Sequence, residues 1–191
     1  MTLRRKPFQE VTMLTAADAV HTYILAKDGN RPFLIKQAFA DDAELQIILN
    51  TDAIAFPAET KGRQAIEDIL VRRFNVDYEN VFTFCLAEPP ESRRRHFACH
   101  LLVGMSAKAD GRLRVGCGRY DWHFDGEGKV QKLVILAEVM KVHAASELTT
   151  IMDWLSALPY PWCSVDRALA HMPPSAGLSE LRTYLEQAEP I

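Results

Sequence analysis

The sequence predicts an α+β protein in which helices precede an antiparallel sheet. Apolar residues recur on one helical face over positions 16–27 and again over positions 62–74. Four strand-like runs joined by turn-forming residues then follow without an intervening helical pattern. These runs are 81–87, 96–107, 113–124 and 130–139. Helices first and a sheet afterwards indicate α+β organisation and not α/β alternation.

The helical part begins at Thr15, whose hydroxyl can cap a first helix. We expect that helix to end at Gly29, because glycine readily adopts the left-handed conformation of a helix stop. A second helix is expected over 30–38, with Asn30 as its cap. A strand over 42–49 then turns back through 53–56 as a hairpin, before the helix that follows Gly62.

The last part of the chain is helical again. Segments with helical spacing are separated by Pro159-Tyr160-Pro161 and by Pro173-Pro174, which interrupt any continuous helix. The chain therefore divides into a domain at 11–145 and a helical C-terminal extension at 146–191. The extension is expected to pack on the sheet or on a partner subunit.

Composition limits the classes of function. The chain has 191 residues, 48% of them hydrophobic, and a formal net charge of -3, so no positive field attracts nucleic acid or an anionic membrane. Its four cysteines form no CxxC pair, which argues against a disulfide framework or a zinc site. The first residues lack the apolar segment of a secretion signal. We expect a cytoplasmic protein without a cofactor.

Three short stretches carry a resemblance to a known family. Phe39 to Ala43 looks like the entry to a first strand, Gly62 to Ile66 like the start of a third helix, and Gly118 to Leu133 like a closing hairpin. In this order they resemble the nuclear transport factor 2-like superfamily, which includes ketosteroid isomerase and the SnoaL-like polyketide cyclases. The resemblance implies a cone-shaped barrel, with three N-terminal helices packed on a strongly curved antiparallel sheet around an apolar pocket.

Strand alternation predicts which side chains face that pocket. One apolar set is formed by Phe97, Cys99, Leu101, Val103 and Met105, and another by Leu133, Ile135, Ala137 and Val139. The resemblance places the aromatic side chains of 120, 122 and 124 inside as well. The predicted ligand-binding residues are Trp122, Phe56, Cys99, Met105, Leu133 and Ile135. The expected ligand is a small hydrophobic or aromatic molecule.

The resemblance also implies a catalytic arrangement. Tyr23 and Tyr120 fall where ketosteroid isomerase has its two oxyanion donors, and buried phenols can stabilise an enolate. Ile47 stands where that enzyme has its general base, so Asp52 or Glu59 in the nearby loop would have to serve. Alternatively, both tyrosines are core aromatics whose hydroxyls bond to backbone groups or to each other.

A polar cluster on the strands has another interpretation. His96, His100, Asp121 and His123 suggest a metal site or an acid–base relay. Alternation places all four on the outer face, where we expect cross-strand pairing and no metal site. That face also carries apolar residues such as Leu102, so it needs a cover. The extension or a second subunit can supply it, and the resemblance implies a homodimer through this face.

Two functions remain open from the sequence. The first is a SnoaL-like lyase, isomerase or cyclase that acts on a hydrophobic substrate by stabilising an enolate. The second is a non-catalytic ligand-binding or dimeric assembly protein of the same fold, because one fold hosts many functions. A titratable base inside the cone would distinguish them.

Overall fold

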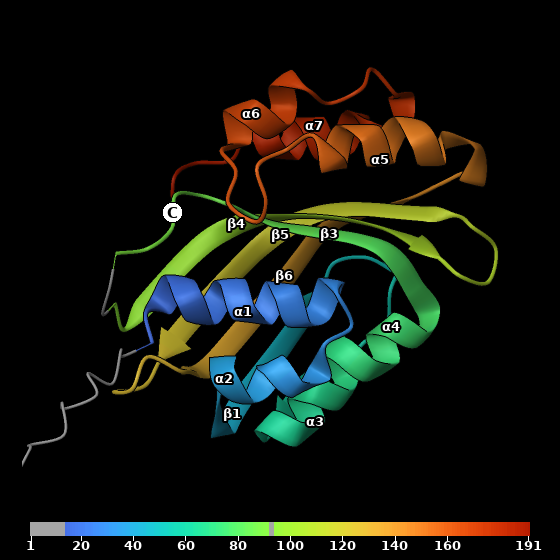
Figure 1. Cartoon of the computed structure of the whole chain (residues 1–191). Coiled ribbons are helices and arrows are strands. Elements are labelled where there is room, and N and C mark those ends of the chain that lie inside the picture. Colours follow the sequence, from blue (N-terminus) through green and yellow to red (C-terminus); the bar gives the residue numbers. More distant parts are fainter. Residues whose placement is uncertain (1–13, 92–93) are drawn as a thin grey trace, which may run out of the picture.

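The computed structural model describes residues 14–91 and 94–191, so the expected domain start at 11–13 lies outside it. A six-stranded sheet in the order β2-β1-β6-β5-β4-β3 separates two layers of helices (Figure 1). The strands are β1 (Phe39–Leu49), β2 (Glu59–Lys61), β3 (Tyr78–Leu86), β4 (His96–Ala107), β5 (Leu113–Phe124) and β6 (Val130–His143). The predicted α+β class is confirmed.

Helices α1 to α4 lie against one face of the sheet, and α5 to α7 lie against the other (Figure 1). The helices are α1 (Ala16–Asp28), α2 (Ile35–Ala38), α3 (Arg63–Glu67), α4 (Phe74–Asp77), α5 (Leu148–Ser156), α6 (Val165–Ala170) and α7 (Ser179–Glu186). A π-helical segment, Asp68–Arg73, joins α3 to α4. In the described ranges 14–91 and 94–191, no helix is both long and apolar enough to cross a bilayer.

The sheet is curved and does not close. Its neighbouring strands are antiparallel, except that β1 runs parallel to β6. β6 lies beside β1 and runs in the same direction, and Leu45 pairs with Leu133 and Ile47 with Ile135. The inward-pointing residues of β1 and β6 therefore lie side by side on the same face of the sheet.

Helix α1 begins as the sequence predicts and ends differently. The Asp18 amide donates to Thr15 Oγ1 (3.0 Å) and the Thr15 amide donates to Asp18 Oδ2 (3.2 Å), which completes a capping box. The expectation of a left-handed Gly29 is wrong, because its φ is -94°. Asn30 adopts the left-handed conformation instead, with φ of 48°. Asparagine tolerates this region because its short side chain can bond locally.

The next two elements are shorter or later than expected. A 3-10 turn, Pro32–Leu34, precedes the single turn of α2, so no continuous helix spans 30–38. The return strand of the hairpin is β2 and not 53–56. The Ala53 amide donates to Thr51 Oγ1 (3.1 Å) and is therefore not used in a strand ladder.

Two hydrophobic cores lie on opposite sides of the sheet. The inner core joins α1 to the inner faces of β4 and β5, and it contains the fully buried Tyr23 and Trp122. The outer core joins Leu102 and Val115 of the sheet to the C-terminal helices. Trp154 of α5 is part of it and donates its ring N–H to the Ala168 carbonyl (3.1 Å). The extension thus covers part of the outer sheet face.

Alternation along β6 is broken by a bulge. Cys117 pairs with Val139 but its neighbour Gly118 pairs with Ala137, so Glu138 is an additional residue on β6. A bulge of this kind changes the facing of the residues that follow it. The predicted inward direction of Val139 is therefore wrong: this residue belongs to the outer core, and Met140 reaches the inner cavity instead.

Candidate functional site

A small cavity lies inside the cone, between α1, the π-helical segment and the inner sheet face. It has a volume of about 60 Å³, and we call it the cone cavity. Its wall is apolar apart from the side chains of Tyr23, Lys27 and Tyr120. Mainly apolar walls with a few polar groups are typical of small-molecule sites, although such sites usually measure about 300–1,000 Å³. The cone cavity is small by that standard.

The structure brings some of the predicted site residues together. Five of them line the cone cavity, namely Tyr23, Tyr120, Phe56, Met105 and Ile135. Three others are buried in the inner core without lining it, namely Trp122, Cys99 and Leu133. The candidate bases Asp52 and Glu59 are exposed, and Ile47 occupies the wall.

Tyr23 places a buried hydroxyl group at the cavity. Its ring is fully buried and packs edge-on against Tyr120 and Trp122, with centroid distances of 6.3 and 5.3 Å. Within the described part of the chain, its hydroxyl has no hydrogen-bond partner. A buried donor without a partner costs about 1–3 kcal/mol. A ligand oxygen that accepted this hydrogen bond would recover that free energy.

Both cavity tyrosines are held in the protonated form. Burial raises the pKa of Tyr23 and of Tyr120 above the ordinary value of a phenol. Tyr120 approaches closely enough to lower the pKa of Tyr23 somewhat, yet the two hydroxyls do not make a hydrogen bond of good geometry. At neutral pH both phenols are therefore donors and not bases.

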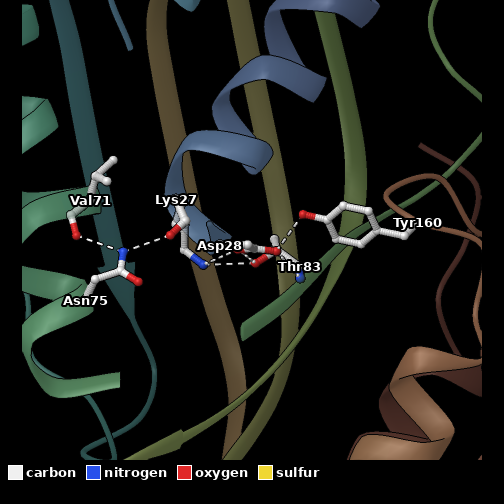
Figure 2. Close-up of polar contacts among 6 residues, drawn as sticks. All are labelled: Lys27, Asp28, Val71, Asn75, Thr83 and Tyr160. Carbon is white, nitrogen blue, oxygen red and sulfur yellow. Dashed lines mark hydrogen bonds and ion pairs between the residues drawn. The ribbon is translucent and has the colours of Figure 1, made fainter. Parts of the chain in front are cut away.

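Lys27 is the site residue that sequence reasoning did not single out. It is only 7% exposed, and its amine donates to Thr83 Oγ1 (2.9 Å) and to Asp28 Oδ1 (3.2 Å), as Figure 2 shows. The same amine lies 4.3 Å from the centre of the Phe74 ring. The available signal was its position one helical turn after Tyr23, on the buried face of α1.

The carboxylate of Asp28 compensates the positive charge of the buried Lys27 amine. Its carboxylate accepts from the Thr83 amide (2.7 Å), from Thr83 Oγ1 (2.7 Å) and from the Tyr160 hydroxyl (3.0 Å) (Figure 2). Burial lowers the pKa of Lys27, and the Asp28 charge opposes that change. A buried charge is tolerated when it is paired and hydrogen-bonded in this way. Tyr160 lies in the extension, so the extension contacts the polar end of the site.

Asn75 fixes the end of α1 against the helices beside it. Its side-chain amide donates to the Lys27 carbonyl (2.8 Å) and to the Val71 carbonyl (2.9 Å), as Figure 2 shows. Val71 belongs to the π-helical segment. Irregular helices of this type are frequent at functional sites. The backbone of Lys27 is thereby held in one place while its amine reaches the cavity.

The polar cluster on the strands lies elsewhere. His96, Asp121 and His123 are on the outer face, and none of them lines the cone cavity. His100 makes a hydrogen bond through Nε2 to the Glu189 carbonyl (2.8 Å), so it contacts the end of the extension.

Solved structures with the same architecture have very different sequences. RV0760c from Mycobacterium tuberculosis matches with a TM-score of 0.52 and 13% identity, over 69% of this chain and 98% of its own. A computationally designed 17-OHP binder also matches with a TM-score of 0.52, at 15% identity, over 67% of this chain and 98% of its own. A protein from Catenulispora acidiphila described with a ketosteroid isomerase-like fold gives 0.49 and 19%, over 61% and 82%.

The two likenesses with a TM-score of 0.52 establish the fold. No protein-family model and no curated protein matches the sequence. The chain has the nuclear transport factor 2-like fold, as its motifs indicated, and the two neighbours with a TM-score of 0.52 match 67% and 69% of this chain.

Proposed function

We propose that this chain binds a small, mainly apolar carbonyl compound in the cone cavity and stabilises the enolate of that compound. Enolate stabilisation is a step in those lyase, isomerase and cyclase reactions that remove a proton next to a carbonyl group. The observation that carries the proposal is the Tyr23 hydroxyl, which is fully buried, faces the cavity and has no partner among the described residues. A carbonyl oxygen at that point would accept its hydrogen bond.

The polar groups of the cavity have complementary roles in this proposal. Tyr23 and Tyr120 donate to the carbonyl oxygen, where negative charge develops as the enolate forms. Lys27 takes the proton from the carbon next to the carbonyl, because burial lowers its pKa and enlarges the fraction of neutral amine. Asp28 and Thr83 hold that amine in position. Asp52 and Glu59, being exposed, are left with no part in the step.

The size of the cavity limits the ligand. An engineered apolar cavity of about 150 Å³ in another protein holds benzene, whereas the cone cavity measures about 60 Å³. Even one ring therefore requires the wall to move. The partly buried Ile54 and Phe56 lie in the segment between β1 and β2 and form the wall best placed to do so. RV0760c has been solved with estradiol-17beta-hemisuccinate, a much larger molecule.

Proton exchange tests the proposal directly. Small ketones and enones are incubated with the protein in D₂O, and loss of the signal from protons next to the carbonyl is followed by NMR. We expect catalysed exchange that Lys27→Met abolishes and Tyr23→Phe slows by about 10²–10³-fold, the usual effect of losing one oxyanion donor. A buried-core control, Phe84→Leu, keeps all cavity groups. Equal exchange with and without protein contradicts the proposal.

The second candidate is a non-catalytic binding or assembly protein. Within the described residues the cavity wall contains no carboxylate, which leaves Lys27 as the sole candidate base. Binding without proton exchange would favour this candidate. On the outer face, Ile48 is 42% exposed beside Leu136, its partner across β1 and β6, in a position to contact a second copy. Sedimentation of wild type and Ile48→Lys tests this homodimer.

A cytoplasmic location is part of the same proposal. All four cysteines are buried and unpaired, which suits a reducing compartment. Fractionation of cells that express the full chain would test it.

A further inference from the structure

We propose that His96, Asp121 and His123 form a binding site for a divalent transition-metal ion such as Zn²⁺ on the outer sheet face. This site is separate from the cone cavity and does not depend on the function proposed for it. It lies where β4 begins and β5 ends, on the part of the sheet near the hairpin between β5 and β6.

Strand pairing places the three side chains on one face. His96 of β4 is directly opposite His123 of β5. Asp121 precedes His123 by two residues, and residues at that spacing point to the same face of a strand. Alternation along each strand already predicts that the three side chains share a face. The observed pairing of β4 with β5 shows in addition that they are neighbours on it.

The ligand atoms also converge. His96 Nε2 lies 2.8 Å from Asp121 Oδ1, and His123 Nε2 lies 3.0 Å from the same oxygen. The two imidazole rings are 4.9 Å apart, and one ligand atom from each residue lies within 4.8 Å of the others. Zinc binds nitrogen and oxygen at about 2.0–2.2 Å, which implies ligand–ligand separations of about 3–3.5 Å. Small side-chain rotations would meet that requirement.

The chemistry of the set selects the class of ion. Two imidazoles and one carboxylate suit Zn²⁺ and other late first-row ions, and they suit Ca²⁺ and Mg²⁺ poorly because those ions prefer oxygen ligands. Three protein ligands leave at least one position for water or for a group from a partner. The site is therefore of the open type.

The surroundings permit ion access. The side chains of His96, Asp121 and His123 are 54%, 30% and 47% exposed, so an ion can enter and the rings can rotate. Across the strands Asp121 lies opposite Ala98 and Val134, neither of which competes for its carboxylate. Lys132 lies opposite His123 and opposes a cation, but solvent and salt screen exposed charges.

Titration calorimetry of the full chain without a histidine tag, stripped of metal by chelation, tests the site with ZnCl₂ and with MgCl₂. We expect one Zn²⁺ per chain, no comparable binding of Mg²⁺, and at least tenfold weaker Zn²⁺ binding by Asp121→Asn and by His123→Ala. The matched control is His21→Ala, which removes an exposed histidine of α1 and should bind like wild type.

A second measurement guards against misfolded variants. The three ligands are partly exposed, so urea unfolding of each variant should stay close to wild type, and Zn²⁺ should shift the imidazole NMR signals of His96 and His123 in the unaltered protein. No Zn²⁺ binding by wild type overturns the proposal. So does binding that survives Asp121→Asn and His123→Ala, or binding that His21→Ala weakens equally.

Discussion

Replacing Tyr23 with phenylalanine should make the protein more stable. The hydroxyl is buried without a partner among the described residues, and leaving such a donor unsatisfied costs about 1–3 kcal/mol. The ring would keep its edge-on contacts with Phe39, Tyr120 and Trp122. Because the substitution removes only the unsatisfied group, we expect the free energy of unfolding to rise by about 1 kcal/mol, the lower end of that range.

Urea unfolding of wild type and Tyr23→Phe measures the difference, with equal dependence on urea concentration as the check that the two native states are alike. Tyr160→Phe is the matched control, because it also deletes one phenolic hydroxyl. That hydroxyl donates to the charged Asp28 carboxylate (3.0 Å), so its loss should lower stability by about 1.5–3 kcal/mol. If Tyr23→Phe lowered stability as much as Tyr160→Phe does, the Tyr23 hydroxyl would have a partner within the protein and would not be free to bind a ligand.

Three further substitutions have outcomes that follow from the same contacts. Asp28→Asn leaves the Lys27 amine without its counter-charge and should lower the free energy of unfolding by about 3–5 kcal/mol, measured in urea. The double variant with Lys27→Met should recover most of this loss. An equal loss of stability in the single and the double variant would contradict the pairing of Lys27 with Asp28. Burial lowers the pKa of Lys27 in the folded state below its ordinary 10.5. Between that lowered pKa and 10.5, the folded state therefore binds fewer protons than the unfolded state. Stability relative to Lys27→Met should therefore rise with pH towards 10.5 in a pH series of melts, and a flat difference would refute it. Phe56→Ala enlarges the cone cavity and should tighten calorimetric binding of single-ring ketones, at a stability cost below the roughly 3–5 kcal/mol of a fully buried phenylalanine; unchanged or weaker affinity would show that Phe56 does not limit entry.

Local patterns in the sequence were sufficient for most of the fold. The capping box at Thr15 and the inward face of β4 depend on residues close together in the chain, and the structure has both. The direction of Val139 was wrong because a bulge depends on how β5 pairs with β6, which alternation within one strand does not contain. The return strand at β2 was missed because it is three residues long and polar, so no hydrophobic pattern marks it.

The candidate site was only half predictable. Tyr23 and Tyr120 came from the resemblance, and both line the cone cavity. Lys27 was missed because lysine is almost never fully buried unless it is paired. Its partner Asp28 is stabilised by Thr83 and Tyr160, which lie 55 and 132 residues further along the chain. No local pattern indicates contacts over such separations.

Methyl NMR of the methionine side chains tests whether a carbonyl compound binds in the cone cavity. Met105 and Met140 line the cone cavity, whereas Met152 and Met172 belong to the core beneath the extension and serve as internal controls. With ¹³C-labelled methionine methyls and increasing cyclohexenone, we expect saturable shifts of Met105 and Met140, no shift of the two controls, and weaker binding by Tyr23→Phe. Shifts confined to Met152 and Met172, or none at any methionine, would contradict a carbonyl-binding site in the cone.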